Sequence, residues 1–266
     1  MSPVKRMSKR SERILMMVAA CTAVLPAQTQ TPLVPDRPEF TATSTLVGKG
    51  FVEFDDGFTF SSQANGYELS APETMVRLGL NDRLELRLDG DGFLSEWNAS
   101  SHAKGPSDGE VSAKVGLFGQ RHLRPSVSII SSVSMPTGGP QFSSRSYDPT
   151  VKVAWDKDLV SGFAAGGNFN LSSITTSGGR IAQKAASFSL SHGLGADFGL
   201  FGEVYAVSPV VAGNPALWSG DGGVTRSIGK NAQVDVRFGK QINSTESTWL
   251  FGAGFTIREP MKWISH

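Results

Sequence analysis

Alternation of apolar and polar side chains with a period of two residues is the feature that most constrains the fold of this chain. The clearest example is the segment 84–89, in which three leucines alternate with Glu85, Arg87 and Asp89. Successive side chains of a β-strand point to opposite faces, so this segment is a strand with one apolar and one charged face. After residue 27 the chain has no apolar run near about 18 residues and no sustained helical periodicity. The sequence therefore predicts an all-β protein.

The same alternation predicts about twelve strands along the chain. They lie near residues 50–60, 74–80, 84–90, 110–118, 124–135, 150–155, 162–172, 184–192, 198–207, 219–226, 232–239 and 247–257. Short connections are expected near 81–83, 119–123, 156–161, 193–197 and 227–231. Long connections are expected near 61–73, 91–109, 136–149, 173–183, 208–218 and 240–246. Bacterial outer-membrane barrels have this regular separation of short periplasmic turns from long external loops.

These observations predict a single antiparallel transmembrane β-barrel of about twelve strands, spanning residues 48–258. Lipid offers no partner to an unpaired backbone N–H or C=O, so such a sheet has to close on itself. Residues 28–47 are rich in Thr and Pro and are expected to form a periplasmic segment that leads into the barrel, and residues 259–266 a C-terminal tail. Because Leu80 and Leu84 share the outward parity, we expect them to pair across a three-residue turn.

The first 27 residues have the pattern of a cleaved export signal. Five basic residues precede the uncharged apolar run 14–25, and Ala27 offers a cleavage site. A lipoprotein signal with Cys21 as the lipidated residue is the second interpretation. Without residues 1–27 the formal net charge falls from +1 to about −3 and no cysteine remains. The exported chain therefore lacks disulfides and a basic nucleic-acid-binding surface.

Charged residues on the inward parity of the strands are the candidate functional residues. They are expected to line the lumen, where both signs of charge are tolerated only if they are paired or hydrated. The nine candidates are Arg77, Glu85, Arg87, Asp89, Lys114, Lys152, Glu203, Asp235 and Arg237. They predict either a wet channel with a selectivity-setting constriction or a barrel filled by structural ion pairs.

Catalytic and metal-binding interpretations find little support in the sequence. His192 shares its strand with several serines, but a Ser–His site also needs spatial contact and an orienting third group. His102 and His122 lack metal-ligand spacing, and Asp89–Gly92 is not followed by the closing Glu of a calcium loop. We expect no catalytic residue, no metal and no cofactor.

Several stretches resemble one bacterial family. They are residues 36–41, residues 76–87, residues 124–126 with 134–138, the pair Asp148-Pro149, and residues 252–255. This chain is similar there, in order, to the outer-membrane transporters named for the meta-pathway of phenol degradation. The resemblance implies a barrel of about twelve strands, a role in transport and an association with aromatic compounds. It departs from the usual barrel pattern at the end, where residues 258–266 extend beyond Ile257.

The expected function is an outer-membrane channel or transporter for passive passage of small molecules, with membrane lipid and a small solute as its partners; the resemblance implies aromatic compounds as solutes. The first alternative is a sealed structural or binding barrel that acts through its external loops. An outer-membrane enzyme with a Ser/His site on the outer rim is a second, and a secreted β-sandwich or lipocalin-like binder is a third.

Overall fold

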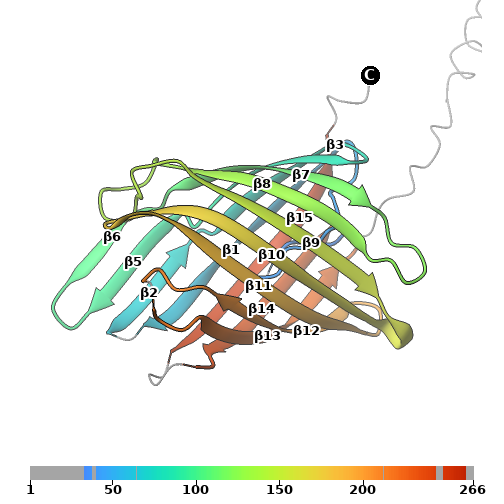
Figure 1. Cartoon of the computed structure of the whole chain (residues 1–266). Coiled ribbons are helices and arrows are strands. Elements are labelled where there is room, and N and C mark those ends of the chain that lie inside the picture. Colours follow the sequence, from blue (N-terminus) through green and yellow to red (C-terminus); the bar gives the residue numbers. More distant parts are fainter. Residues whose placement is uncertain (1–32, 38–39, 64, 212, 244–247, 262–266) are drawn as a thin grey trace, which may run out of the picture. The chain divides into compact units, whose positions relative to one another are not determined.

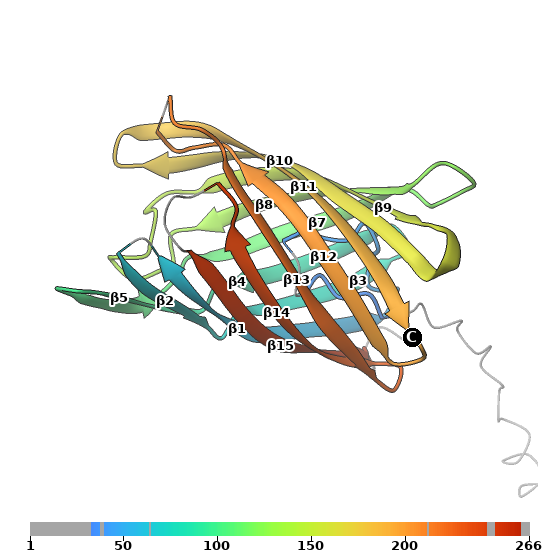
Figure 2. The same cartoon turned by 90° about the horizontal axis from the view of Figure 1, so that it is seen from below.

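The computed structural model describes residues 33–37, 40–63, 65–211, 213–243 and 248–261. Within these residues, fifteen β-strands join in one antiparallel sheet that closes on itself (Figures 1 and 2). The strands are β1 (Phe51–Gln63), β2 (Gly66–Ala71), β3 (Thr74–Asn81), β4 (Leu84–Gly90), β5 (Phe93–Asn98), β6 (His102–Pro106), β7 (Gly109–Phe118), β8 (Ser126–Met135), β9 (Asp148–Asp158), β10 (Phe163–Thr176), β11 (Gly179–Leu194), β12 (Phe198–Val207), β13 (Leu217–Ile228), β14 (Ala232–Gln241) and β15 (Trp249–Pro260). The predicted export signal lies outside the described residues.

The wall of the barrel has twelve strand positions, as the sequence predicts. Three of these positions are each occupied by two consecutive strands: β2 with β3, β4 with β5, and β6 with β7. The pairing shows this directly, because β1 pairs with both β2 and β3, while β5 pairs with β2 and β6 just as β4 pairs with β3 and β7. Each of the twelve predicted strands overlaps one wall strand.

Strands β2, β5 and β6 correct the expectation that 61–73 and 91–109 are long loops. Their backbones pair with one another and extend the wall beyond the breaks near Pro72, Gly92 and Ser107. Pro72 has no N–H to give to a ladder, and Gly92 has a φ of +62°, a left-handed conformation that interrupts a strand. These breakers hide the continuation of the strands from the sequence pattern.

Closure comes from the pairing of the first wall strand with the last. β1 pairs with β15 over a register that runs from Phe51 opposite Pro260 to Ser61 opposite Leu250. The sheet therefore has no free edge along this seam, which is what a hydrocarbon surrounding requires. Beyond the predicted barrel boundary at residue 258, β15 continues to Pro260, and the Met261 N–H donates to the Gly50 carbonyl at 2.7 Å.

The apolar residues of the predicted outward parity lie on the exposed face of the wall. Leu86 and Leu88 of β4 are 40% and 54% exposed, whereas the intervening Arg87 is 4% exposed. Other exposed apolar side chains on this face include Val111, Val151, Phe169, Phe188, Leu200, Val236, Phe238 and Phe255. Among the described residues, no helix is long and apolar enough to cross a membrane.

Two further connections differ from the expectation. The turn after β3 has two residues rather than three, because Asn81 pairs with Leu84 and a β-bulge between Gly79 and Asn81 takes up the extra residue. The segment 173–183, expected to be a long loop, instead forms a tight hairpin in which Thr176 pairs with Gly179. We call the end of the barrel with the turn at Asp82 the short-turn end, and the end with this hairpin the long-loop end.

Candidate functional site

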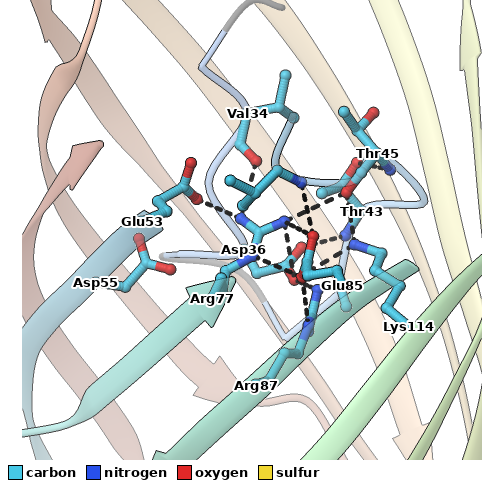
Figure 3. A network of polar contacts seen from close by, with 12 residues as sticks. Val34, Asp36, Thr43, Thr45, Glu53, Asp55, Arg77, Glu85, Arg87 and Lys114 are labelled. Carbon is cyan, nitrogen blue, oxygen red and sulfur yellow. Dashed lines mark hydrogen bonds and ion pairs between the residues drawn. The ribbon is translucent and has the colours of Figure 1, made fainter. Parts of the chain in front are cut away.

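Residues 33–37 and 40–47, which we call the inner segment, lie inside the barrel. Figure 3 shows Val34, Asp36 and Thr45 of this segment facing charged side chains of the wall. The described part of the segment 28–47 therefore contacts the inner face of the wall, and its expected periplasmic location stays a prediction. A segment without regular structure needs partners for its backbone N–H and C=O groups. Here the polar residues of the lumen supply those partners.

A compact set of ion pairs holds one side of the inner segment. Arg77 of β3 bridges Glu53 of β1 and Glu85 of β4, with Arg77 Nε 3.0 Å from Glu85 Oε1. Arg87 of β4 contacts Glu85 Oε1 at 2.7 Å. We call these residues, together with Asp36 and Lys114, the central ion cluster; its three carboxylates balance its three cations.

Asp36 is the inner segment's contribution to the central ion cluster. Its carboxylate pairs with Arg87 and lies 3.6 Å from Lys114 Nζ and 3.9 Å from Arg77 Nη2. Burial alone would raise the pKa of Asp36, but the three cations outweigh it and hold the pKa well below its usual range. Asp36 therefore stays ionised, and the segment is tied to the wall by charge.

Backbone groups of the segment also bind the cluster. Val47 N donates to Glu85 Oε2 at 2.6 Å, and Lys114 Nζ donates to the Thr45 carbonyl at 2.7 Å. Arg77 donates to the carbonyls of Val34 and Thr45 as well. Arg77, Glu85 and Lys114 are each 0% exposed, so these contacts are buried inside the barrel.

The opposite wall holds the segment by hydrogen bonds rather than by ion pairs. Glu203 of β12 accepts from Thr41 N at 2.9 Å and from Thr41 Oγ1 at 2.6 Å. Asn168 of β10 accepts from Ala42 N at 2.7 Å and donates to the Ala42 carbonyl at 2.9 Å. This pair of bonds reproduces what a neighbouring β-strand would offer. Asp156 of β9 accepts from Thr43 Oγ1 at 2.8 Å.

Two further side chains fix the segment in place. The Phe40 ring stacks on Tyr205 of β12, with ring centroids 4.3 Å apart. Arg37 lies 3.1 Å from Glu73 and 3.8 Å from Asp235. A Cβ on Gly254 would fall 2.6 Å from Arg37 Nε, so the glycine permits this close approach.

Cavities lie on both sides of the inner segment. On the long-loop side, a cavity of about 410 Å³, which we call the outer chamber, is lined by Asp55, Asp89, Asp91 and Glu110 among others. A cavity of about 250 Å³ adjoins it and adds Ile130 and Lys152 to its lining. On the short-turn side, a cavity of about 200 Å³ is lined largely by Ser and Thr hydroxyls and by Asp156 and Asp158. The segment thus separates two polar spaces of the lumen.

The structure places the nine candidate residues in three groups. Arg77, Glu85, Arg87 and Lys114 meet in the central ion cluster. Glu203 and Asp235 contact the inner segment. Asp89, Lys152 and Arg237 line the cavities on the long-loop side. Their role in selectivity stays a prediction.

Sequence reasoning missed Asp36, Asp156 and Asn168, which meet at the inner segment. Asp36 lies before the first strand, so the alternation of side chains along a strand could not predict which way Asp36 points. Asn168 lies on the inward parity and is uncharged, so a charge-based selection passed over it. The polar residues at 36–45 do not alternate as they would in a strand, and this was the signal that could have identified the inner segment.

Two of the histidines make ring contacts with aromatic side chains. The His192 ring stacks on Phe163 with centroids 4.2 Å apart. Ser95 Oγ lies 2.9 Å from His102 Nε2 at the exposed β5–β6 hairpin, and the His102 ring stacks on Trp97. Among the described residues, no carboxylate is hydrogen-bonded to either ring, and no three His, Cys, Asp or Glu residues are grouped to hold a metal ion.

Comparison with solved structures finds the same fold. An outer membrane channel from Pseudomonas putida F1 superposes with a TM-score of 0.63 at 12% identity, covering 81% of this chain and 98% of that one. The NanC porin gives a TM-score of 0.54 at 11% identity, covering 77% and 98%. The KdgM porin in complex with disordered oligogalacturonate gives 0.52 at 10% identity, covering 76% and 98%.

No curated protein matches the chain by sequence. A family model does: the one described as "Putative MetA-pathway of phenol degradation" matches residues 35–258, which begin in the inner segment and end in β15. The match covers most of the chain, including the segment inside the lumen, and it agrees with the resemblance seen in the sequence. The chain therefore belongs to this family.

Proposed function

We propose that this protein is an outer-membrane channel for passive passage of small molecules, including aromatic compounds. The observation that carries the proposal is a lumen lined by charged and polar side chains, with cavities on both sides of the inner segment. These cavities leave space for a small solute, which a lumen completely filled by ion pairs would not. The family's connection with phenol degradation supports aromatic compounds as solutes.

The proposal includes location and orientation. The exposed apolar face of the wall suits lipid, so the barrel belongs in the outer membrane. The short-turn end then faces the periplasm and the long-loop end faces the exterior, the arrangement typical of such barrels. Residues 1–27 would be removed on export; the intact mass of the purified protein tests this, and a lipid on Cys21 would appear as added mass.

The inner segment limits how easily a solute passes through the lumen. Its bonds to both walls leave the two lumenal spaces separated, so a solute larger than water passes when the segment shifts. The segment has one charged anchor at Asp36 and one hydrogen-bonded anchor at Thr41–Thr43. Locking the segment to the wall should therefore reduce conductance without altering the barrel.

A disulfide offers such a lock. Thr41 Oγ1 lies 2.8 Å from Ser187 Oγ, so cysteines at these two positions would bring their sulfur atoms within bonding reach. Ser44 Oγ and Ser126 Oγ are also 2.8 Å apart and provide a second, independent lock. The chain from residue 28 onward has no cysteine that could compete.

The test is the planar-bilayer conductance of folded residues 28–266, measured for both double-cysteine variants under oxidising and reducing conditions. We expect current steps in the native chain, smaller or absent steps in the oxidised variants, and recovery after reduction. The native chain treated with the same reductant is the control. A folded native barrel that carries no current and releases no solute from liposomes would refute the channel function.

A sealed barrel acting through its external loops is the second candidate. The observation that favours it is the burial of all six residues of the central ion cluster, each of which is at most 8% exposed. It predicts no conductance for the native chain or for any variant, so the same recordings separate the two. The Ser95–His102 contact gives the enzyme alternative its one geometric feature, and hydrolysis of a nitrophenyl ester by the native chain but not by His102→Ala would be needed to support it.

A further inference from the structure

The outer chamber carries an excess of negative charge. Seven carboxylates and two guanidiniums line it. Several are already compensated: Asp36 in the central ion cluster, Glu73 by Arg37, and Asp108 by the N–H groups of Gly138 and Ser144. Within the part of the chain that the structure describes, the remaining carboxylates, those of Asp55, Asp89, Asp91 and Glu110, have no ion-pair partner.

These carboxylates lie close to one another. Asp89 of β4 and Glu110 of β7 are directly opposite in the ladder, and like charges in that position repel. Asp91 directly follows β4 and lines the outer chamber beside them. A cation in the chamber would relieve this repulsion.

Asp55 gives an independent indication of a missing partner. It is 0% exposed and lines the outer chamber from β1. Its Oδ1 accepts from Thr256, but its Oδ2 has no hydrogen-bond partner in the described structure. Burying a carboxylate oxygen without a donor is unfavourable, so a ligand with N–H groups would stabilise this site.

Basic groups also lie in or beside the outer chamber. Arg37 is engaged by Glu73 and Asp235, and Arg237 donates to Thr59 Oγ1 at 2.9 Å. Lys152 and Arg87 line the adjoining cavity, which Asp89 and Glu110 also line, so seven carboxylates and four basic groups line the two cavities together. The carboxylates still outnumber the basic groups in the chamber, so its field favours positive charge.

The apolar part of the chamber defines the rest of the ligand. Phe40 and Met75 line both the outer chamber and the adjoining cavity, where Ile130 joins them. The described residues offer no set of three or more side chains grouped to hold a metal ion. The ligand chemistry that fits is therefore an ammonium head beside the carboxylates and an apolar body against Phe40 and Met75.

We propose that the outer chamber binds small organic cations with an apolar body, such as amines that carry one aromatic ring, and disfavours the corresponding anions. The inference rests on the proposed channel function, for which it specifies the class of solute admitted from the long-loop end. The chamber itself is nevertheless testable by binding to the folded protein, with no need for current.

Three probes of equal ring size separate charge from shape: benzylammonium, benzyl alcohol and benzoate. Calorimetric titration of folded residues 28–266 in detergent should show benzylammonium binding most tightly and benzoate most weakly. Asp89→Asn and Glu110→Gln should each weaken benzylammonium binding about tenfold, since each removes one charge from a low-dielectric site. Asp82→Asn, in the exposed short turn, is the matched control and should bind like the native chain.

Benzoate binding as tightly as benzylammonium would overturn the inference, as would unchanged binding in both variants after their folding is verified by heat-modifiable migration. Bilayer recordings separate this failure from that of the channel function. Benzylammonium binding without any current would sustain the chamber and refute the channel. Current with equal permeability to benzylammonium and benzoate would sustain the channel and refute the chamber.

Discussion

The outer and inner faces of the same strands obey different rules. On β4 the outward Leu86 and Leu88 are exposed. The inward Glu85 and Arg87 are buried, and each contacts partners more than thirty residues away in the chain, at Val47 and Asp36 respectively. β14 repeats the contrast, with Val236 exposed outward and Asp235 beside Arg37 inside.

The outer and inner faces are therefore stabilised by different interactions. The outer face needs only to be apolar, because lipid packs equally well against any aliphatic or aromatic side chain. The inner face needs matched charges and donors, because a buried polar group without its partner destabilises the fold. Substitutions outside should therefore follow polarity alone, and substitutions inside should follow the identity of the partner.

The largest effect is expected inside, from Asp36→Asn. This change leaves Arg77, Arg87 and Lys114 with two carboxylates in place of three. Removing one partner of a buried ion pair costs about 3–5 kcal/mol, so the free energy of unfolding in lipid vesicles should fall by that order. Bilayer conductance should rise, because the inner segment loses its charged anchor.

The control for Asp36→Asn is Asp82→Asn, an isosteric change at an exposed turn, which should alter the unfolding free energy by less than about 0.5 kcal/mol. A change at Asp36 no larger than that at Asp82 would mean that the ion pairs of the central ion cluster contribute nothing net, and the contrast between the faces would fail.

Next in size is an outward substitution, Val236→Arg. Arginine on the lipid face near the bilayer midplane costs about 2–4 kcal/mol, so the variant should assemble poorly into vesicles. The measurement is the fraction of heat-modifiable, folded protein. Val236→Leu keeps the face apolar and should assemble normally. If Val236→Arg assembles normally, or folds without lipid, then the outer face does not contact a membrane.

A smaller effect is expected from Glu203→Gln. The amide keeps the shape but loses the charge that strengthens the bonds from the N–H groups of Phe40 and Thr41. Hydrogen bonds to charged groups contribute about 1.5–3 kcal/mol, and part of that should be lost from the unfolding free energy. Hydrogen exchange of residues 40–42 should accelerate, while exchange in β1 and β15 stays unchanged. Unaltered exchange at 40–42 would show that Glu203 does not hold the segment.

The smallest effect is expected from Phe40→Leu, which removes the ring stacked on Tyr205 and keeps an apolar side chain. Aromatic pairs contribute about 0.5–1.5 kcal/mol beyond their buried area, so the unfolding free energy should fall only slightly. Combined with Tyr205→Leu, the loss should be less than the sum of the two single losses. Strict additivity in that double-mutant cycle would mean that the rings do not interact.

The sequence predicted the strands of the wall but not the contacts inside the lumen, because a strand's pattern is local to its own residues. Alternation placed all twelve wall strands, because each strand carries its own apolar face in its own residues. The pairing at the turn after β3 was wrong, since a bulge at Gly79–Asn81 restored the parity that a two-residue turn would otherwise have broken. The continuation strands β2, β5 and β6 were missed where Pro72 and Gly92 interrupt the pattern.

The sequence by itself determined the fold class, the number of wall strands and the outward face of the twelve predicted strands, because these follow from a period of two residues and from the need for closure in lipid. Only the tertiary structure decided that the inner segment turns into the lumen, and that Asp36 meets Arg87 while Asn168 meets Ala42. No local pattern encodes those contacts, since their partners lie far apart in the chain and are brought together when the sheet closes around them.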